Sequence, residues 1–172
     1  MNIIVRPAEA ADAPGIARVH VESWRETYRG SVSDDLLDDP DFVARRKRFW
    51  TAALTDAHFR KNSAAVALLR GEIVGIGMAG PALDEGATWE MQLYVLYTYA
   101  AIHGQGAAGA LLTAVIGPQD SAALWVANPN PRAQAFYRKH GFTFDGTTKV
   151  EDGVREVRMT RQATRIDRAA SH

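Results

Sequence analysis

A glycine-rich segment, residues 104–109, carries the clearest chemical signal in the chain. It reads Gly104-Gln105-Gly106-Ala107-Ala108-Gly109 and lies between an apolar run and a helical pattern. Backbone N–H groups at a helix N-terminus attract a phosphate or pyrophosphate, and glycine has no Cβ to hold the phosphate away from them. A tight strand-to-helix turn packed on a sheet uses the same residue types. The spacing alone leaves both interpretations open.

Gly104, Gly106 and Gly109 also satisfy the G-x-G-x-x-G pattern of dinucleotide-binding folds. That fingerprint closes the first strand of a β-α-β unit and is followed about 20 residues later by an acidic residue for the ribose. Here the glycines come late in the chain, and the next apolar run ends in Ala127-Asn128-Pro129 without an acid. A dinucleotide-dependent oxidoreductase is therefore disfavoured.

Other side chains could bind a substrate or move a proton. Glu90, Gln92 and Tyr94 alternate along an apolar run, so they share one face of a strand. Trp24 and Tyr28 are four residues apart and share one face of a helix. Their rings could stack on a substrate or bind a cation, and core packing explains Trp24 equally well.

Composition excludes several kinds of chemistry and several partners. The chain has no cysteine, which excludes a disulfide and a cysteinyl intermediate, and its five histidines show no metal-ligand spacing, so no metal is expected. Among 172 residues, 20 basic and 20 acidic side chains leave no excess of cations for nucleic-acid phosphates. No apolar run approaches the ~20 residues of a membrane span or forms a signal peptide. We expect a cytoplasmic protein without a nucleic-acid or membrane partner.

Hydrophobic periodicity predicts the elements that must position these residues. Alternating and continuous apolar runs predict strands at 2–6, 64–69, 73–79, 89–97, 122–127, 142–144 and 154–159. Apolar residues three and four apart predict helices after Asp12, after Asp39-Pro40, from Ala110 to Gly117-Pro118, and from Asn130-Pro131 to Gly141. Neither a repeat nor a linker divides the chain.

A second motif follows the glycine segment. Asn130, Ala133, Phe136, Tyr137, Gly141 and Phe142 spell N-x-x-A-x-x-F-Y-x-x-x-G-F. The two motifs together resemble the GNAT superfamily of acetyl-CoA-dependent N-acetyltransferases. The resemblance implies one α/β (α+β) domain over residues 3–160, with a mixed, mostly antiparallel sheet whose central strands splay apart and which is flanked by helices. Residues 161–172 are expected to form a frayed tail.

The resemblance also implies a set of coenzyme-binding residues. The family's loop pattern is Arg or Gln, two residues, Gly, one residue, then Gly or Ala, and its backbone N–H groups hold the coenzyme A pyrophosphate. His103, Gly106 and Ala108 take those places, with Gly104, Gln105, Ala107 and Gly109 completing the loop. The backbone of Leu93, Tyr94 and Val95 is expected to pair with the pantetheine arm, and Asn130 to lie near it. The chain departs from the family at His103, usually a cation, and in a longer 95–104 connection.

The implied reaction transfers the acetyl group of acetyl-CoA to a primary amine of a small molecule or peptide. Without a cysteine, direct attack by the amine in a ternary complex is the simplest route. Tyr137 takes the place of the tyrosine that protonates the coenzyme sulfur, and Glu90 is the expected base, acting directly or through water. Trp24, Tyr28 and Gln92 are expected to contact the acceptor. A non-catalytic acyl-CoA sensor of the same fold stays open as an alternative, and so does a homodimer.

Overall fold

The computed structural model describes residues 2–164. Its elements in chain order are β1 (Ile3–Pro7), η1 (Ala10–Asp12), α1 (Ala13–Tyr28), α2 (Asp34–Leu37), α3 (Phe42–Thr55), η2 (Ala57–Phe59), β2 (Ser63–Leu69), β3 (Glu72–Pro81), β4 (Met91–Thr98), η3 (Ala100–Ile102), α4 (Ala107–Val115), β5 (Ala122–Ala127), α5 (Pro131–Lys139), β6 (Thr143–Glu151) and β7 (Val154–Arg161). Residues 165–172 of the predicted tail lie outside the described residues.

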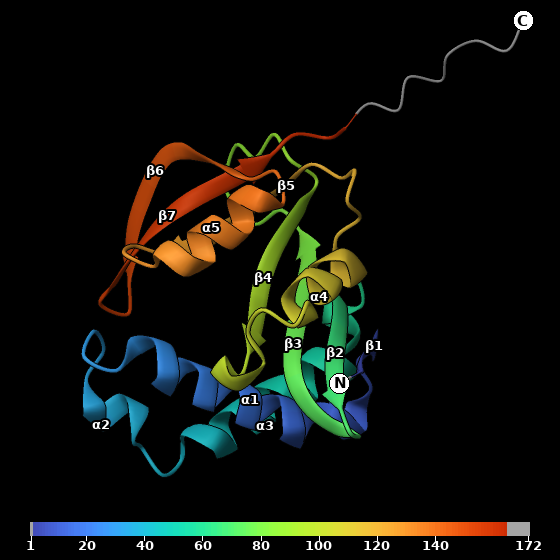
Figure 1. Ribbon diagram of the computed structural model, residues 1–172, viewed down its shortest axis with the longest axis vertical. Coiled ribbons are helices and arrows are strands. Elements are labelled where there is room, and N and C mark those ends of the chain that lie inside the picture. Colours follow the sequence, from blue (N-terminus) through green and yellow to red (C-terminus); the bar gives the residue numbers. More distant parts are fainter. Residues whose placement is uncertain (1, 165–172) are drawn as a thin grey trace, which may run out of the picture.

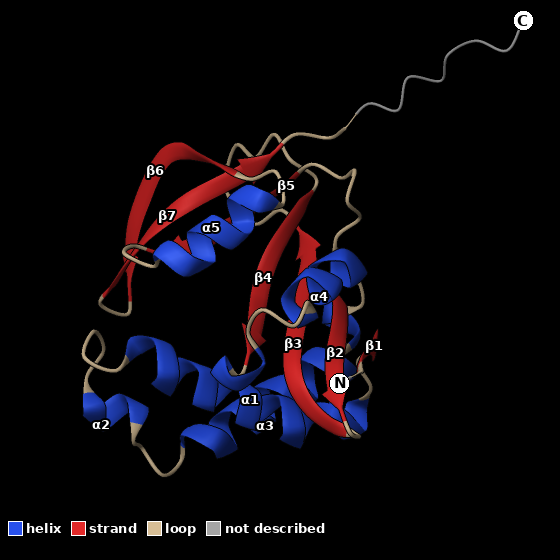
Figure 2. Cartoon of the chain, viewed as in Figure 1, coloured by secondary structure: helices blue, strands red, loops and turns tan. Residues whose placement is uncertain are grey.

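One mixed sheet organises the chain, in the strand order β1-β2-β3-β4-β5-β7-β6. All neighbouring strands are antiparallel except β4 and β5, which are parallel and pair over only three residues each, Met91–Leu93 with Ala122–Leu124. Beyond that point β4 and β5 diverge, as Figures 1 and 2 show. The predicted mostly antiparallel sheet with splayed central strands is therefore confirmed.

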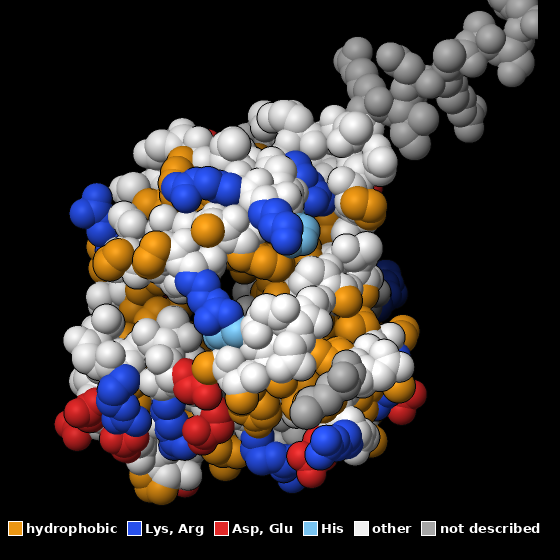
Figure 3. Space-filling view, viewed as in Figure 1, with side chains coloured by type: hydrophobic (Ala, Val, Ile, Leu, Met, Phe, Trp, Pro, Cys, Tyr) orange, Lys and Arg blue, Asp and Glu red, His pale blue; other side chains and the backbone are white. Residues whose placement is uncertain are grey.

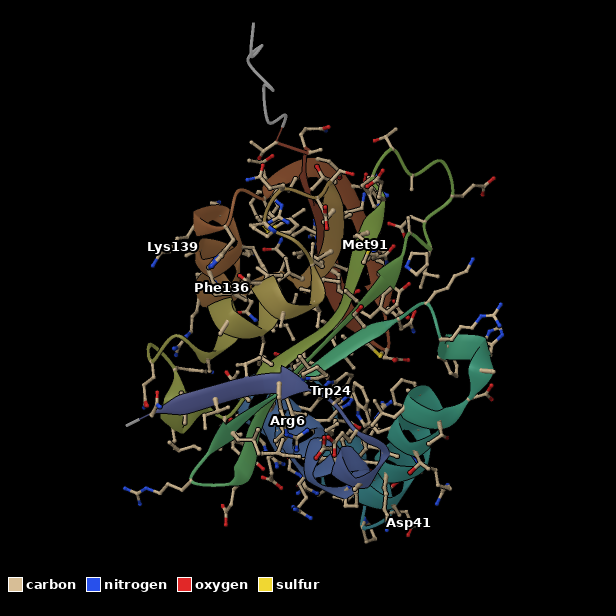
Figure 4. The ribbon with its side chains drawn as sticks, turned by 90° about the vertical axis from the view of Figure 1, so that its right-hand side faces the viewer. Arg6, Trp24, Asp41, Met91, Phe136 and Lys139 are labelled. Atoms are coloured by element: carbon tan, nitrogen blue, oxygen red, sulfur yellow. The ribbon has the colours of Figure 1, made fainter. Side chains whose placement is uncertain are left out.

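Helices cover both faces of this sheet. Figure 4 shows the molecule with α5, which carries Phe136 and Lys139, on one side and α3, near Asp41, on the other. The core against α4 and α5 contains Leu93, Leu111 and Tyr137, whereas the core against α1 and α3 contains Trp50 and Val95. Each core buries the apolar stripe of an amphipathic helix, which is the main source of the fold's stability.

A bulge at Tyr94 allows β4 to serve both cores. Val95 lies opposite Met78 of β3 and Leu93 lies opposite the next residue, Ala79, so Tyr94 is the extra residue. Leu93 and Val95, which regular alternation would place on one face, thereby enter the α4/α5 core and the α1/α3 core respectively. The bulge directly follows the last residue of β4 that pairs with β5.

Several predicted boundaries shift in the structure. The strand predicted at 89–97 begins at Met91, the helix after the glycines begins at Ala107, and the last hairpin extends well beyond 142–144. Arg161, predicted to begin the tail, belongs to β7 and donates to the carbonyls of Gly117, Asp120 and His140. These long-range hydrogen bonds hold the end of the strand in place. No described helix is long and apolar enough to cross a membrane.

The close approach of α4 to the sheet depends on Gly75 in β3. A Cβ at this position would lie 2.9 Å from Leu111 Cδ1, 3.0 Å from Thr98 Cγ2 and 3.3 Å from the Tyr97 carbonyl oxygen. We expect Gly75→Ala to lower the free energy of unfolding by about 1–3 kcal/mol, because this site is already filled. Gly77→Ala is the matched control, since its Cβ would meet only ordinary contacts of 3.5 Å or more. Urea denaturation of both variants measures the difference, and equal losses would contradict the packing argument.

His20 predicts a pH dependence of stability. It is 4% exposed, its Nδ1 accepts a hydrogen bond from Trp50 Nε1 at 3.1 Å, and burial, then the charge of Arg46, lowers its pKa to about 3. The unfolded chain binds this proton more tightly, with a pKa of about 6.5. The unfolding free energy should therefore fall as the pH drops from about 6.5 toward 3, by about 1.4 kcal/mol per unit from this residue. In His20→Asn, which cannot titrate, urea denaturation should give a shallower slope, whereas an unchanged slope would show that His20 is charged in the fold.

Candidate active site

The divergence of β4 from β5 leaves one edge of β4 without a strand partner. Leu93 is the last residue of β4 that pairs with β5, and the strand continues to Thr98 paired with β3 alone. Backbone N–H and C=O groups on such an edge bind an extended ligand as they would bind an added strand. Of the three residues predicted to pair with the pantetheine arm, Tyr94 and Val95 lie on this edge. Leu93 lies at its start, inside the β4–β5 ladder.

The glycine loop lies between β4 and α4. Gly106 is the N-cap of α4 and, like Gly104, has a positive φ, +85° and +77° respectively. A Cβ at either position would meet no atom within 4 Å, so the space above the loop is open. The first turn donates from Ala110 N to the Gly106 carbonyl. The N–H groups of residues 107–109 precede that bond and are free of helical partners, which suits an anion.

Gln105 and His103 of the predicted loop offer less to a phosphate than the glycines do. Gln105 donates its N–H to the Ile102 carbonyl at 3.3 Å, so this group is already used within the turn. Partial burial, followed by the nearby charge of Arg132, lowers the pKa of His103. His103 is therefore neutral at pH 7 and supplies no charge to a phosphate.

The cation that the sequence interpretation missed is Arg132. It is exposed in the first turn of α5 and close enough to His103 to affect that side chain's pKa. A cation in the first turn of a helix opposes the helix dipole, so the helix itself gains nothing from this residue. An arginine in the first turn of a predicted helix is therefore a sequence signal for a role outside the helix. On the face that carries α4 and α5, Figure 3 shows basic and histidine side chains together at the rim of a hollow.

Tyr137 of α5 lies in the core beside the diverging strands. Its ring packs against Phe136 and Phe142 at centroid distances of 5.2 and 6.0 Å. Burial, then the neighbouring Tyr97 and Tyr28, raises the pKa of Tyr137, so the phenol keeps its proton at neutral pH. Its hydroxyl makes no hydrogen bond to any described residue, which leaves that group available to a ligand.

Aromatic residues of α1 face the opposite side of this opening. Trp24 donates from Nε1 to the Tyr97 hydroxyl at 3.0 Å, and its ring meets that of Tyr28 at 4.9 Å. Burial, then Tyr97 and Glu156, raises the pKa of Tyr28. The predicted acceptor residues Trp24 and Tyr28 are thus brought together with Tyr97, within electrostatic range of Tyr137.

Glu90 and Gln92 are not brought to the same place. Glu90 is exposed and precedes β4, and its N–H donates to Ser121 Oγ at 3.0 Å on the paired side of the divergence. Gln92 is buried, and its Oε1 accepts from Leu83 N at 2.9 Å, which secures the β3–β4 connection. Glu90 does not alternate with Gln92 and Tyr94 on one strand face, because β4 begins at Met91, one residue after Glu90.

Asn130 has a structural role in the fold. Its Oδ1 accepts from Ala133 N at 3.2 Å and caps α5. The long 95–104 connection is also explained, because its additional residues form η3, where Ala100 N donates to Glu26 of α1 at 2.9 Å. This turn carries the chain from the end of β4 back to the glycine loop.

A carboxylate that the sequence interpretation missed lies on β7. Glu156 pairs with Ala127 of β5 and Lys149 of β6. Its neighbour Val157 packs with the α4/α5 core, so Glu156 points to the other face of the sheet, the one that carries α1. Its side chain is 20% exposed and lies 3.4 Å from Lys149 Nζ. Burial raises the pKa of Glu156.

Other kinds of site find no support in the described part of the chain. No group of three or more His, Cys, Asp or Glu residues there could hold a metal ion. A pocket of about 550 Å³ lies between β1, β2 and the end of α3, and no predicted site residue lines it. The glycine loop opens the β4-α4-β5 unit, whose parallel strands pair over only three residues each and come late in the chain, whereas a dinucleotide fingerprint follows the first strand of a largely parallel sheet.

Known proteins are similar to this chain in sequence. A family model described as an acetyltransferase (GNAT) domain matches residues 41–163. A probable N-acetyltransferase of Mycobacterium tuberculosis is 28% identical over 98% of this chain and 96% of its own length. An uncharacterized N-acetyltransferase of the same species is 39% identical over 88% of this chain and 86% of its own.

Solved structures show the same fold. The PaiA N-acetyltransferase of Thermoplasma acidophilum, in complex with coenzyme A, superposes with a TM-score of 0.73 at 17% identity, covering 94% of this chain and 99% of that one. YncA of Salmonella typhimurium, with its cofactor acetyl-CoA, gives a TM-score of 0.68 at 17% identity over 100% and 99% of the two chains. The family match spans more than half of the chain and includes both of its sequence motifs. The chain therefore belongs to the GNAT family and is an acyltransferase.

Proposed function

We propose that this protein transfers the acetyl group of acetyl-CoA to a primary amine of a small molecule or peptide, by direct attack in a ternary complex. The observation that carries the proposal is the Tyr137 hydroxyl, protonated and without a protein partner, beside the free edge of β4. Two relatives of known structure were solved with coenzyme A or acetyl-CoA, which supports the choice of donor.

The proposed coenzyme site follows from the groups left unpaired. The N–H groups of residues 107–109 receive the pyrophosphate, with Arg132 supplying the charge that neutral His103 does not. The edge of β4 at Tyr94 and Val95 pairs with the amides of the pantetheine arm. The thioester is thereby directed into the divergence, toward Tyr137.

The chemistry divides between a proton donor and a proton acceptor. The neutral amine attacks the thioester carbonyl, a C–N bond forms and the C–S bond breaks. Tyr137 donates its proton to the departing sulfur. Burial raises the pKa of Tyr137, so the phenol still holds its proton at neutral pH when the thiolate forms. The proton of the amine leaves to a base. The sequence predicts Glu90 as this base, acting directly or through water, but Glu90 is exposed on the paired side of the divergence, so the base is chosen by comparing it with a carboxylate nearer the opening.

The first prediction concerns the phosphate cradle. Gly106→Glu places a negative charge over the loop, so acetyl-CoA affinity should fall at least about tenfold by calorimetry. Gly71→Glu is the matched control, because Gly71 has the same left-handed backbone, φ +83°, and lies in the distant β2–β3 turn. An equal affinity for the two folded variants would remove the loop from the coenzyme site.

The second prediction concerns Tyr137. Tyr137→Phe keeps the ring packing and deletes only the hydroxyl, so kcat and kcat/KM should fall together by ~10–10³-fold with little change in acetyl-CoA affinity. Steady-state release of coenzyme A measures this with any amine that the protein acetylates. Tyr99→Phe is the matched control. It removes the hydroxyl of another tyrosine, which is partly buried at the start of η3, and should leave kcat unchanged. Wild-type turnover in Tyr137→Phe would show that Tyr137 serves only in core packing. If the wild-type protein binds acetyl-CoA but acetylates no amine, it is a sensor rather than an enzyme.

A further inference from the structure

Arg46 of α3 differs from every other partly buried arginine among the described residues. Five such arginines bind carboxylates or backbone carbonyls: Arg6, Arg25, Arg45, Arg158 and Arg161. Arg46 forms no ion pair with a described residue, and its Nε is buried without a hydrogen-bond partner. A buried N–H without a hydrogen-bond partner is unfavourable, and an acceptor that reached the guanidinium would satisfy it.

The closest partners of the Arg46 guanidinium are aromatic rings. Its guanidinium lies over the rings of Trp24 and Phe42, 5.8 and 5.4 Å from their centroids. His20, the titratable neighbour on α1, is neutral because burial and this same arginine lower its pKa to about 3. The adjacent Arg45 is already bound to Asp39 at 2.7 Å. Arg46 therefore lies on the aromatic wall with its Nε unpartnered and without an ion pair to a described residue.

Glu156 lies on the β5–β7 side of the opening. It pairs with Ala127, three residues beyond the last residue of β5 that pairs with β4, and points to the face of the sheet that carries α1. Burial raises the pKa of Tyr97, whereas Arg46 acts to lower it and Glu156 acts to raise it. Tyr97 thus feels an arginine and a carboxylate, and the two do not form an ion pair with each other.

We propose that the acetyl acceptor is an amino carboxylate, whose carboxylate binds Arg46 and whose amine is held and deprotonated by Glu156. This inference rests on the proposed acetyl transfer and names its acceptor class and base. A guanidinium stacked on an aromatic ring is well suited to a carboxylate, since its planar fork donates two parallel hydrogen bonds. Glu156 accepts one proton from the ammonium, the freed nitrogen pair attacks the thioester carbonyl to form the C–N bond, and the C–S bond breaks as Tyr137 donates its proton to the sulfur. The second proton that the nitrogen loses passes through solvent and restores the Tyr137 hydroxyl.

Paired acceptors test the carboxylate site. Free amino acids and the matching amino-acid amides differ only in that group, and coenzyme A release measures both. Wild-type protein should show a lower KM for at least one free acid than for its amide, and Arg46→Gln should raise the KM of the acid at least about tenfold while leaving that of the amide unchanged. Arg45→Gln, on the same helix, should change neither value.

A second readout separates binding from folding. Arg46→Gln removes an unpaired charge, so its melting temperature should equal or exceed that of the wild type. Equal effects of the variant on acid and amide, or no preference in the wild type, would overturn the acceptor class while leaving acetyl transfer intact. Acetylation of no amine at all would overturn the proposed function and this inference together.

Glu156→Gln tests the base. Its kcat should fall by about 10²-fold or more with acetyl-CoA affinity retained, and the acidic limb of the kcat/KM pH profile should be lost. Glu151→Gln is the matched control, since Glu151 also binds Lys149 and has no role in this mechanism. A purely structural Glu156 would change the melting temperature and leave the pH profile intact. That result, or a loss of turnover in Glu90→Gln instead, would overturn the assignment.

Discussion

The parallel contact between β4 and β5 is the constraint on which the rest of the structure depends. It lasts for three residues in each strand and then ends, although both strands continue. Backbone groups on the edge of β4 beyond Leu93 have no strand partner, so they are available to an extended ligand. The bulge at Tyr94 begins where the pairing stops, and Tyr137 of α5 lies beside the opening.

The glycine-loop end of this opening and the face formed by α1 and β7 carry different chemical groups. At the end of β4, Gly106 and the first turn of α4 present backbone donors, with Arg132 close by. On the other face, α1 supplies aromatic rings and β7 supplies Glu156. A donor that enters from the glycine loop and an acceptor that enters past α1 would therefore meet at the divergence, each on groups of suitable charge.

Local patterns predict much of this arrangement. The alternating runs, the glycine segment and the motif around Asn130 and Tyr137 suffice to predict the fold, and the glycine segment is where we propose that the coenzyme binds. Glu90 was placed on the strand because the alternation continues to it, whereas sheet pairing starts β4 at Met91. Arg46 and Glu156 carry no local signal at all, since their meaning arises from α3 and β7 approaching Tyr97 in the folded chain. Arg132 could have been singled out from the sequence, because the helix dipole disfavours a cation in the first turn of a helix.

Hydrogen exchange with and without coenzyme A tests the central claim most directly. If the free edge of β4 is the site, saturating coenzyme A should slow exchange at amides of residues 94–98 that face β5 and at residues 107–109 of α4. Amides of β2 and β3, already paired on both sides, should change little. Tight binding of coenzyme A with unchanged exchange along β4 would contradict the account.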